Sequence, residues 1–134
     1  MSIAKYHLST QPIPEGFQIF EDNVLIAGVN FQRAEVLAFA KADDVWLELE
    51  RDSENIHDSN AIKVIGCCKT LQNFERHFIG FVPRGLSKVI IEKNCFKTIR
   101  PRLSKTYVDD YGYIEVLFQI LGPKGMKKEF FALF

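Results

Sequence analysis

Acidic and polar side chains gather in one segment of the chain, LERDSENIHDSNAIKV, which covers residues 49–64. Four carboxylates and one imidazole lie there, on Glu50, Asp52, Glu54, Asp58 and His57. Carboxylate and imidazole groups bind divalent cations, so one hypothesis is a metal-dependent nuclease or hydrolase. That chemistry requires the five side chains to converge in the fold. A solvated acidic edge is the simpler interpretation.

Sequence motifs that mark common catalytic centres are absent. Gly122, Gly125 and the Lys127–Lys128 pair do not form a GxxxxGK phosphate loop followed by Ser or Thr. Neither the GxSxG motif of serine hydrolases nor the HExxH motif of metalloproteases occurs in the sequence. We therefore expect a binding module with no catalytic activity and no cofactor.

Three cysteines, Cys67, Cys68 and Cys95, are the softest metal ligands of the chain. A zinc site built from them and His77 is one alternative, but no two of these residues have the CxxC or HxxxH spacing that marks zinc. Adjacent cysteines do not easily bridge each other, and an odd number gives no disulfide framework. We expect no metal site and three buried or half-buried thiols.

The net charge of zero conceals a division between two parts of the chain. Residues 1–60 carry 4 basic and 11 acidic side chains, whereas residues 61–134 carry 13 basic and 6 acidic ones. From Arg76 to Lys105, eight Lys or Arg residues are opposed only by Glu92. Such a division indicates a polarised surface and a polyanionic partner, with an ordinary solvated face as the alternative.

Short alternating segments must position these side chains. Residues 45–50 (VWLELE) alternate apolar and polar side chains, which is typical of a half-buried strand. Further apolar runs predict strands at residues 23–29, 61–65, 78–82, 95–108 and 113–121. Helical spacing predicts a helix at residues 31–42, with Asn30 as its N-cap, and a second at residues 85–94.

Six short strands and two inserted helices favour a mainly β fold, arranged as a small closed or nearly closed barrel. The 134 residues are enough for one domain and not for two, so we expect a single domain over residues 1–134, with residues 1–20 as an extended lead-in. No apolar run approaches the ~20 residues of a membrane helix, and the first residues lack a secretory signal. We therefore expect an intracellular, cytoplasmic protein.

Three segments follow one another in a fixed order: IAGVNF at residues 26–31, the polar segment at residues 49–64, and IGFVPRGLSKVII at residues 79–91. In these segments the sequence resembles the HIRAN domain, which occurs in Rad5-type and helicase-like-transcription-factor remodelling ATPases and as free-standing bacterial proteins. The positions that match the family pattern are Arg51, Asp52, Asn55, Asp58, Asn60, Ala61, Ile62, Val64, Gly80, Val82, Pro83, Arg84 and Leu86. The resemblance covers residues 24–91, about half of the chain.

The resemblance implies a modified oligonucleotide-binding (OB-like) barrel that captures the single-stranded 3′ end of DNA. It assigns Phe31 to stacking on the terminal base, which contributes about 1–3 kcal/mol per base. Asp58, with Asn55 beside it, is assigned to the 3′-hydroxyl, because a carboxylate accepts a hydrogen bond from a hydroxyl and repels a phosphate. Arg84 would bind a backbone phosphate, and Lys88 would extend the basic track.

Four positions depart from the family pattern. His57 replaces the usual tyrosine and Phe81 replaces a tyrosine or histidine, although each keeps a ring face for stacking. Asn30 stands where the remodelling enzyme has an arginine that contacts DNA, and Ile56 replaces a proline. We expect Asn30, His57 and Phe81 to remain in the site, and we expect the affinity for DNA to be lower than in the remodelling enzymes.

Structural roles are the alternatives for several of these residues. Phe31 is then a core side chain at the start of a helix, and Lys88 an ordinary surface charge. Asn55 and Asp58 then satisfy backbone donors as Asx-turns, a role that is compatible with ligand binding. Phe118 is a candidate for a late aromatic residue of the DNA groove.

The partners implied are single-stranded DNA, in repair or replication, and a DNA-processing enzyme acting in trans. Arg100 and Arg102 would lengthen the basic track. The main alternative is a protein-interaction barrel that does not bind DNA. Its support is KKEFFALF at residues 127–134, which would dock on a partner, associate weakly with a second copy, or form a last barrel strand.

Overall fold

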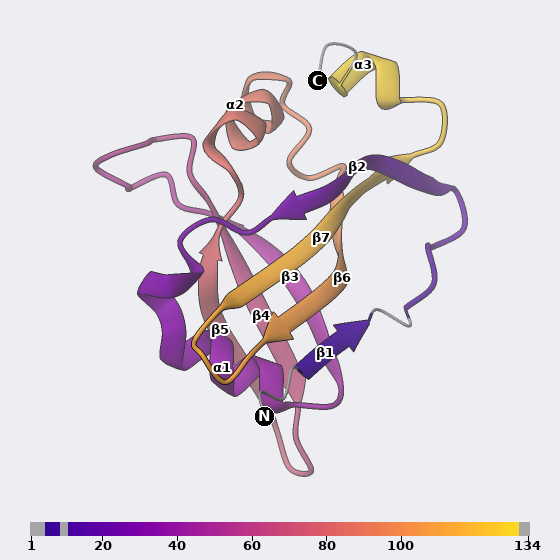
Figure 1. Ribbon diagram of the computed structural model, residues 1–134. Coiled ribbons are helices and arrows are strands. Elements are labelled where there is room, and N and C mark those ends of the chain that lie inside the picture. The colour runs from indigo at the N-terminus through magenta and orange to yellow at the C-terminus, as the bar shows by residue number, and fades with distance from the viewer. Residues whose placement is uncertain (1–4, 9–10, 132–134) are drawn as a thin grey trace.

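The computed structural model describes residues 5–8 and 11–131, which form a mainly β fold (Figure 1). The strands in these residues are β1 (Lys5–Leu8), β2 (Phe17–Leu25), β3 (Val45–Arg51), β4 (Ile62–Lys69), β5 (Phe74–Phe81), β6 (Arg100–Val108) and β7 (Ile114–Pro123). The helices are α1 (Arg33–Lys41), α2 (Arg84–Glu92) and α3 (Lys127–Phe131), and a 3-10 helix, η1 (Val29–Gln32), leads into α1.

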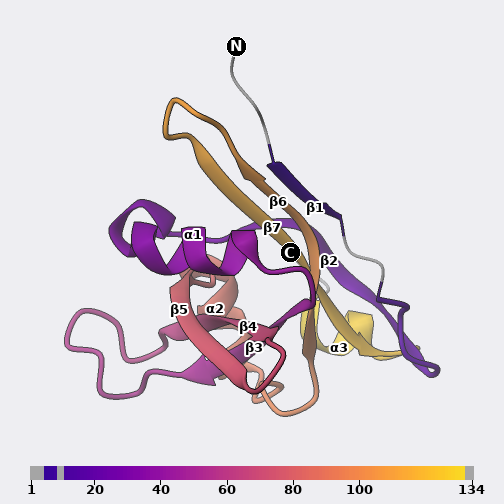
Figure 2. The same ribbon diagram turned by 90° about the horizontal axis from the view of Figure 1, so that it is seen from below.

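The strands pair into two antiparallel sheets, one in the order β1-β6-β7-β2 and the other in the order β3-β4-β5. Helix α1 packs against the three-stranded sheet, as Figure 2 shows, and buries Val36 and Phe39. Gly66 of β4 leaves room for the Phe39 ring, because a Cβ at Gly66 would lie 2.6 Å from Cδ1 of Phe39. The mainly β character predicted from the sequence is confirmed.

Both sheets contribute to one hydrophobic core. Its largest side chains are Phe20 of β2, Phe39 of α1 and Phe118 of β7, each essentially inaccessible to solvent. Large apolar side chains of this kind dominate the free energy gained on folding. The prediction that Phe118 lines a binding groove is therefore wrong, because β7 lies between β6 and β2 and directs Phe118 into the core.

The chain directly after β2 joins the two sheets. The backbone N–H of Ile26 donates to the carbonyl of Val116 in β7 at 3.0 Å. Ala27 N–H donates to the Phe81 carbonyl at 2.8 Å, and the Ala27 carbonyl accepts from Phe81 N–H at 2.9 Å. Gly80 permits this approach, because a Cβ at that position would lie 2.5 Å from the Ala27 carbonyl oxygen.

The strand pairing does not form a closed barrel among the described residues. Within residues 5–8 and 11–131, strand pairing gives two sheets linked by the Ala27–Phe81 bridge and no single closed sheet. The predicted OB-like barrel is therefore not confirmed.

Some predicted boundaries differ from the observed ones. The strand predicted at residues 23–29 ends at Leu25, since Gly28 adopts a left-handed conformation (φ 77°) and turns the chain into η1. Asn30 lies inside η1 and the N-cap of α1 is Gln32, so the prediction of Asn30 as the N-cap is wrong.

The hairpin of β4 and β5 is longer than the apolar runs at residues 61–65 and 78–82 indicate. Its outer half pairs residues 66–69 with residues 74–77, which places glycine and cysteine opposite charged or polar residues, and a hydrophobic pattern does not detect such mixed pairs. Residues 5–8 of the predicted lead-in pair with β6 as an edge strand.

Helix α3 occupies the segment that the sequence left open as a last barrel strand. That interpretation is wrong for residues 127–131, which are helical. The Phe131 ring is buried 5.5 Å from the Phe20 ring, so this apolar side chain serves the protein's own core. Residues 132–134 lie outside the described residues. In the part that is described, no helix combines the length and the apolar character needed to cross a membrane.

Replacing Gly80 with alanine tests the junction of the sheets. The added Cβ would press on the Ala27 carbonyl oxygen, so we expect Gly80→Ala to lower the free energy of unfolding by about 1–3 kcal/mol. Gly85→Ala in α2 is the control, because no atom lies within 4 Å of a Cβ there. Urea unfolding should show Gly85→Ala as neutral or more stable by about 0.5–1 kcal/mol. Equal midpoints for Gly80→Ala and the unmodified protein would contradict this view of the junction.

Candidate functional site

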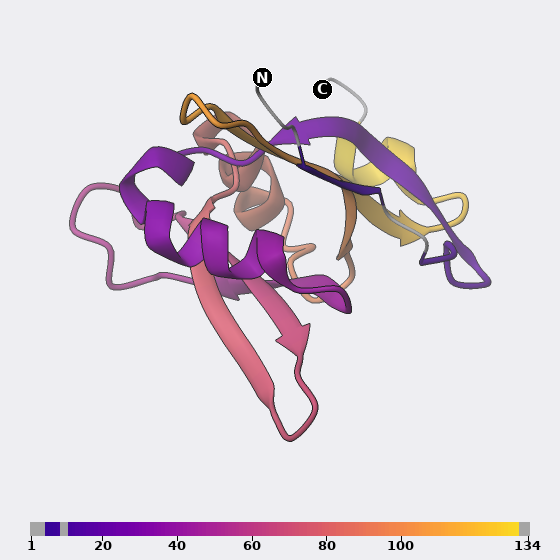
Figure 3. The same cartoon turned by 60° about the horizontal axis from the view of Figure 1, so that its bottom comes forward.

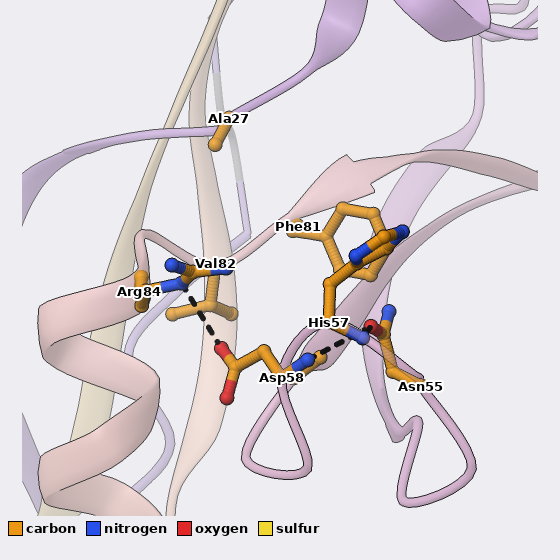
Figure 4. A pocket seen from close by; sticks show the side chains of 8 residues that line it. Ala27, Asn55, His57, Asp58, Phe81, Val82 and Arg84 are labelled. Atoms are coloured by element: carbon orange, nitrogen blue, oxygen red, sulfur yellow. Dashed lines mark hydrogen bonds and ion pairs between the residues drawn. The ribbon is translucent and has the colours of Figure 1, made fainter.

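A pocket of about 290 Å³ lies where the β3–β4 loop meets the end of β5 and the start of α2 (Figure 4). Its lining residues are Ala27, Asn55, His57, Asp58, Ala61, Phe81, Val82 and Arg84. Five of these, namely Asn55, His57, Asp58, Phe81 and Arg84, are residues that the sequence predicted for a binding site. The structure thus brings together side chains from two segments that are well separated in the chain.

Asn55 organises the loop between β3 and β4. Its side-chain oxygen accepts hydrogen bonds from the backbone N–H groups of His57 (2.9 Å) and Asp58 (3.1 Å). Its amide donates to the Asp52 carboxylate at 3.0 Å. The Asx-turn interpretation of Asn55 is therefore confirmed, and both ends of its amide are engaged within the loop.

Asp58 divides its two carboxylate oxygens between the loop and the pocket. Oδ1 accepts a hydrogen bond from the backbone N–H of Asn60 at 2.9 Å, which is again an Asx-turn. Oδ2 lies 3.5 Å from Nε of Arg84, and Figure 4 shows the two side chains facing each other. The Asp58 side chain is 19% exposed and that of Arg84 is 73% exposed. The carboxylate is thus fixed in place while the guanidinium lies largely in solvent.

An apolar wall completes the pocket. Ala27 and Phe81, the two residues of the bridge that joins the sheets, form it together with Val82. The Phe81 ring packs edge-on against Phe78 at 5.2 Å, and Val82 N–H donates to the Ile62 carbonyl at 3.0 Å. The pocket therefore offers one carboxylate, one guanidinium, one imidazole and one phenyl ring to a ligand.

The other three predicted residues do not line the pocket. Asn30 and Phe31 lie on η1, three and four residues beyond Ala27, and Lys88 lies on α2 one turn after Arg84. Phe31 is 89% exposed, so its alternative as a core side chain is wrong. Lys88 is exposed and 4.0 Å from Glu92 in the next turn of the helix.

Arg100 and Arg102 lie on β6 of the other sheet and have partners there. Arg100 stacks over the Phe17 ring at 4.5 Å, and Arg102 donates to the Gln119 side chain at 2.8 Å. Neither residue lines the pocket. The basic stretch of the sequence is therefore distributed over both sheets.

The acidic residues of the β3–β4 segment do not form a metal centre with His57. Among the described residues, the one group of three or more acidic, His or Cys side chains with closely spaced ligand atoms is formed elsewhere, by Cys68, Glu75 and His77. The Asp52 carboxylate is already hydrogen-bonded to Asn55. The hypothesis of a metal-dependent hydrolase built on this segment therefore finds no support in the geometry.

The three thiols are buried and form no disulfide, as the sequence predicts. Burial raises the pKa of the Cys67 thiol to about 11, with the nearby Glu48 carboxylate adding to the effect. Burial also raises the pKa values of Cys68 and Cys95 above the ordinary thiol value. These thiols are therefore protonated at neutral pH and are poor nucleophiles.

Sequence reasoning missed the small apolar residues of the pocket. Ala27, Ala61 and Val82 line it, yet none of them has a side chain that indicates a function. The available signal was Gly28, a glycine shortly after an apolar run, which marks a corner where the chain changes direction.

Comparison with known proteins finds similar chains among solved structures only. No family model matches the chain, and no curated protein sequence does. Among solved structures, the chain is similar to the HIRAN domain of human HLTF. The two share 15% identity over 87% of this chain and 88% of that one, with a TM-score of 0.48. A Lactobacillus plantarum protein matches at 17% identity over 91% of this chain and 99% of its own, with a TM-score of 0.42.

Removal of the Asn55 side chain tests whether that residue holds the loop. Asn55→Ala deletes three hydrogen bonds and leaves two backbone donors without their partner. We expect the free energy of unfolding to fall by about 1–3 kcal/mol. Asn30→Ala, at an exposed position on η1, should change it by less than about 0.5 kcal/mol. Thermal unfolding of both variants supplies the comparison, and equal effects would contradict the role assigned to Asn55.

Proposed function

We propose that the protein is a binding module for single-stranded DNA that holds the 3′-hydroxyl end in the pocket of Figure 4. The observation that carries the proposal is the pairing of Asp58 and Arg84 beside the Phe81 ring. It places a hydrogen-bond acceptor, a phosphate-binding group and an apolar surface within one pocket. The resemblance of residues 24–91 to the HIRAN domain implies the same ligand.

Asp58 selects the end of a strand over its interior. Oδ1 is occupied by the backbone of Asn60, and Oδ2 is directed at the pocket. A terminal hydroxyl donates a hydrogen bond to Oδ2, whereas a phosphodiester or a 3′-phosphate at that place has no proton to donate and is repelled by the carboxylate. The pocket therefore prefers a strand that ends there.

Arg84 binds the last phosphate of the strand. In the absence of DNA its guanidinium lies near Asp58 but is 73% exposed, so it can turn toward a phosphate without leaving a buried site. Such a contact is a charge-assisted hydrogen bond, which is roughly twice as strong as a neutral one. Lys88 lies one turn further along α2 and meets the preceding phosphate.

The apolar wall and the exposed Phe31 receive the end of the strand. A pocket of about 290 Å³ is at the small end of ligand sites, which span roughly 300–1,000 Å³. It suits a single nucleotide and excludes a duplex. His57 and Phe81 contact the terminal sugar and base, and Phe31, at 89% exposure, stacks on a base outside the pocket. Because stacking does not read sequence, binding is tolerant of sequence.

This function belongs to DNA repair or replication, where free 3′ ends arise. The module recruits or positions a DNA-processing enzyme that acts in trans. Asn30, in place of a basic side chain, contributes no charge beside Phe31 and lowers the affinity.

Substitution of Asp58 tests the proposed end recognition. We expect the unmodified protein to bind a labelled strand of about 10 nucleotides with a 3′-hydroxyl at least ~10-fold more tightly than the same strand with a 3′-phosphate. Asp58→Asn keeps an acceptor for the Asn60 backbone and removes the charge, so the preference should fall to about 2-fold or less. Fluorescence anisotropy at low and moderate salt measures both affinities.

Two controls separate recognition from general charge effects. Glu50→Gln removes an exposed carboxylate from the same segment and should leave the preference unchanged. Phe31→Ala should weaken both strands alike, by a factor that corresponds to the ~1–3 kcal/mol of one stacked base. Equal binding of all strands, together with a steep loss of affinity in salt, would indicate an unspecific basic surface and contradict the proposal. So would the absence of any binding.

A further inference from the structure

The β4–β5 hairpin carries a cluster of metal-ligating side chains that is separate from the pocket. Sγ of Cys68 lies 3.6 Å from Oε1 of Glu75, and Nε2 of His77 lies 3.3 Å from the same oxygen. The three ligand atoms all lie within 4.8 Å of one another. None of these residues contributes to the candidate DNA site.

Strand register explains why these side chains meet. Cys68 and Glu75 are direct partners across the hairpin, and His77 follows Glu75 by two residues on the same face. Gly66 pairs with His77 and has no side chain, which allows the Phe39 ring of α1 to pack over the hairpin there. Helix α1 crosses this part of the hairpin, as Figure 3 shows, and supplies Glu35.

Glu35 fixes the histidine from the other side. Its Oε2 lies 2.6 Å from Nδ1 of His77, while Nε2 of the same ring faces Glu75. The ring thus has a carboxylate at each of its two nitrogens, and the Glu75 oxygen at Nε2 also lies next to Sγ of Cys68. A cation on that side of the ring is within reach of all three ligand atoms.

We propose that Cys68, Glu75 and His77 bind one Zn²⁺ ion, with Glu35 as a positioning residue. Thiolate, imidazole and carboxylate are the ligands that zinc prefers. Tetrahedral zinc, with bonds of about 2.0–2.3 Å, places neighbouring ligand atoms roughly 3.3–3.6 Å apart. The two separations from Glu75 already have these values. A carboxylate on the distal histidine nitrogen is also a common feature of zinc sites.

The burial of the cluster fits an ion reached from solvent. Cys68 is buried and the His77 side chain is 15% exposed, whereas Glu75 is 54% exposed. The two inner ligands are thus held by the fold, and the outer one borders on water, which supplies the fourth ligand. Binding releases the thiol proton of Cys68 and ties the hairpin to α1 through His77 and Glu35.

The other two cysteines provide matched controls. Cys67 is the neighbour of Cys68 but faces the opposite side of β4, with its sulfur near the Ile65 carbonyl. Cys95 follows α2 and its sulfur lies near the Ile90 carbonyl. Both are buried thiols outside the cluster.

Metal titration of the full-length, untagged protein tests the proposal. After treatment with a chelator and its removal, isothermal titration should show one equivalent of Zn²⁺ bound. Co²⁺ in place of Zn²⁺ should give the visible bands of a tetrahedral site and a near-ultraviolet thiolate-to-cobalt band. The proposal would be overturned if zinc did not bind stoichiometrically or if the cobalt spectrum lacked the thiolate band. Both measurements use the unmodified protein.

Substitutions then assign the ligands. Cys68→Ala and His77→Gln should each weaken zinc binding at least ~100-fold. In the cobalt-loaded protein, Cys68→Ala should abolish the thiolate band, and His77→Gln should shift the visible bands. Glu35→Gln should weaken binding about 10–100-fold while the thiolate band remains. Cys67→Ala and Cys95→Ala should bind zinc as the unmodified protein does. Unchanged affinity in Cys68→Ala would overturn the assignment, and circular dichroism of each variant checks its fold.

Discussion

The close approach of two backbones at Gly80 is the constraint on which the structure depends. Ala27 and Phe81 exchange two hydrogen bonds there, and only a residue without a Cβ leaves space for the Ala27 carbonyl. Because Ile26 bonds at the same time to β7, one short segment links the four-stranded sheet to the three-stranded one. That link holds the two sheets against the core that they share, which includes Phe20 and Phe118.

The candidate site follows from the same junction. Phe81 forms part of the bridge and Val82 bonds to Ile62, at the point where the β3–β4 loop re-enters its sheet. Pro83 then starts α2, so that Arg84 in the first turn faces the loop that carries Asp58. The Asp58 carboxylate and the Arg84 guanidinium therefore lie on either side of the backbone hydrogen bond between Val82 and Ile62. The fold thus fixes the Asp58 carboxylate and the backbone of Arg84, while the exposed Arg84 guanidinium can turn between Asp58 and a phosphate.

Sequence patterns predicted the parts of this arrangement that depend on local rules. The alternation in residues 45–50 predicted β3. The five predicted residues that line the pocket came from the resemblance of residues 49–64 and 79–91 to the HIRAN domain. Local rules do not report which segments meet across the fold. They therefore missed Ala27 in the pocket, the helical end of the chain, and the burial of Phe118.

The metal-ligating cluster was recognised only in part, since the sequence suggested Cys68 and His77 as zinc ligands, but with Cys67 and Cys95 in place of Glu75. Its ligands are brought together by register across a hairpin, so they lack the short regular spacing that identifies most zinc sites in sequence. The Glu-x-His alternation on one strand face, opposite a cysteine, is the pattern that could have indicated it. Such a pattern becomes informative only once the pairing of the two strands is known.

The most direct test of the account is a titration of the ¹⁵N-labelled protein with a single strand ending in a 3′-hydroxyl, followed by amide chemical shifts. The account predicts the largest changes at Ala27, in residues 55–61 and in residues 81–84, the backbone segments that surround the pocket. Changes confined to β6 and α3, on the other sheet, would place any DNA contact elsewhere and contradict the central claim.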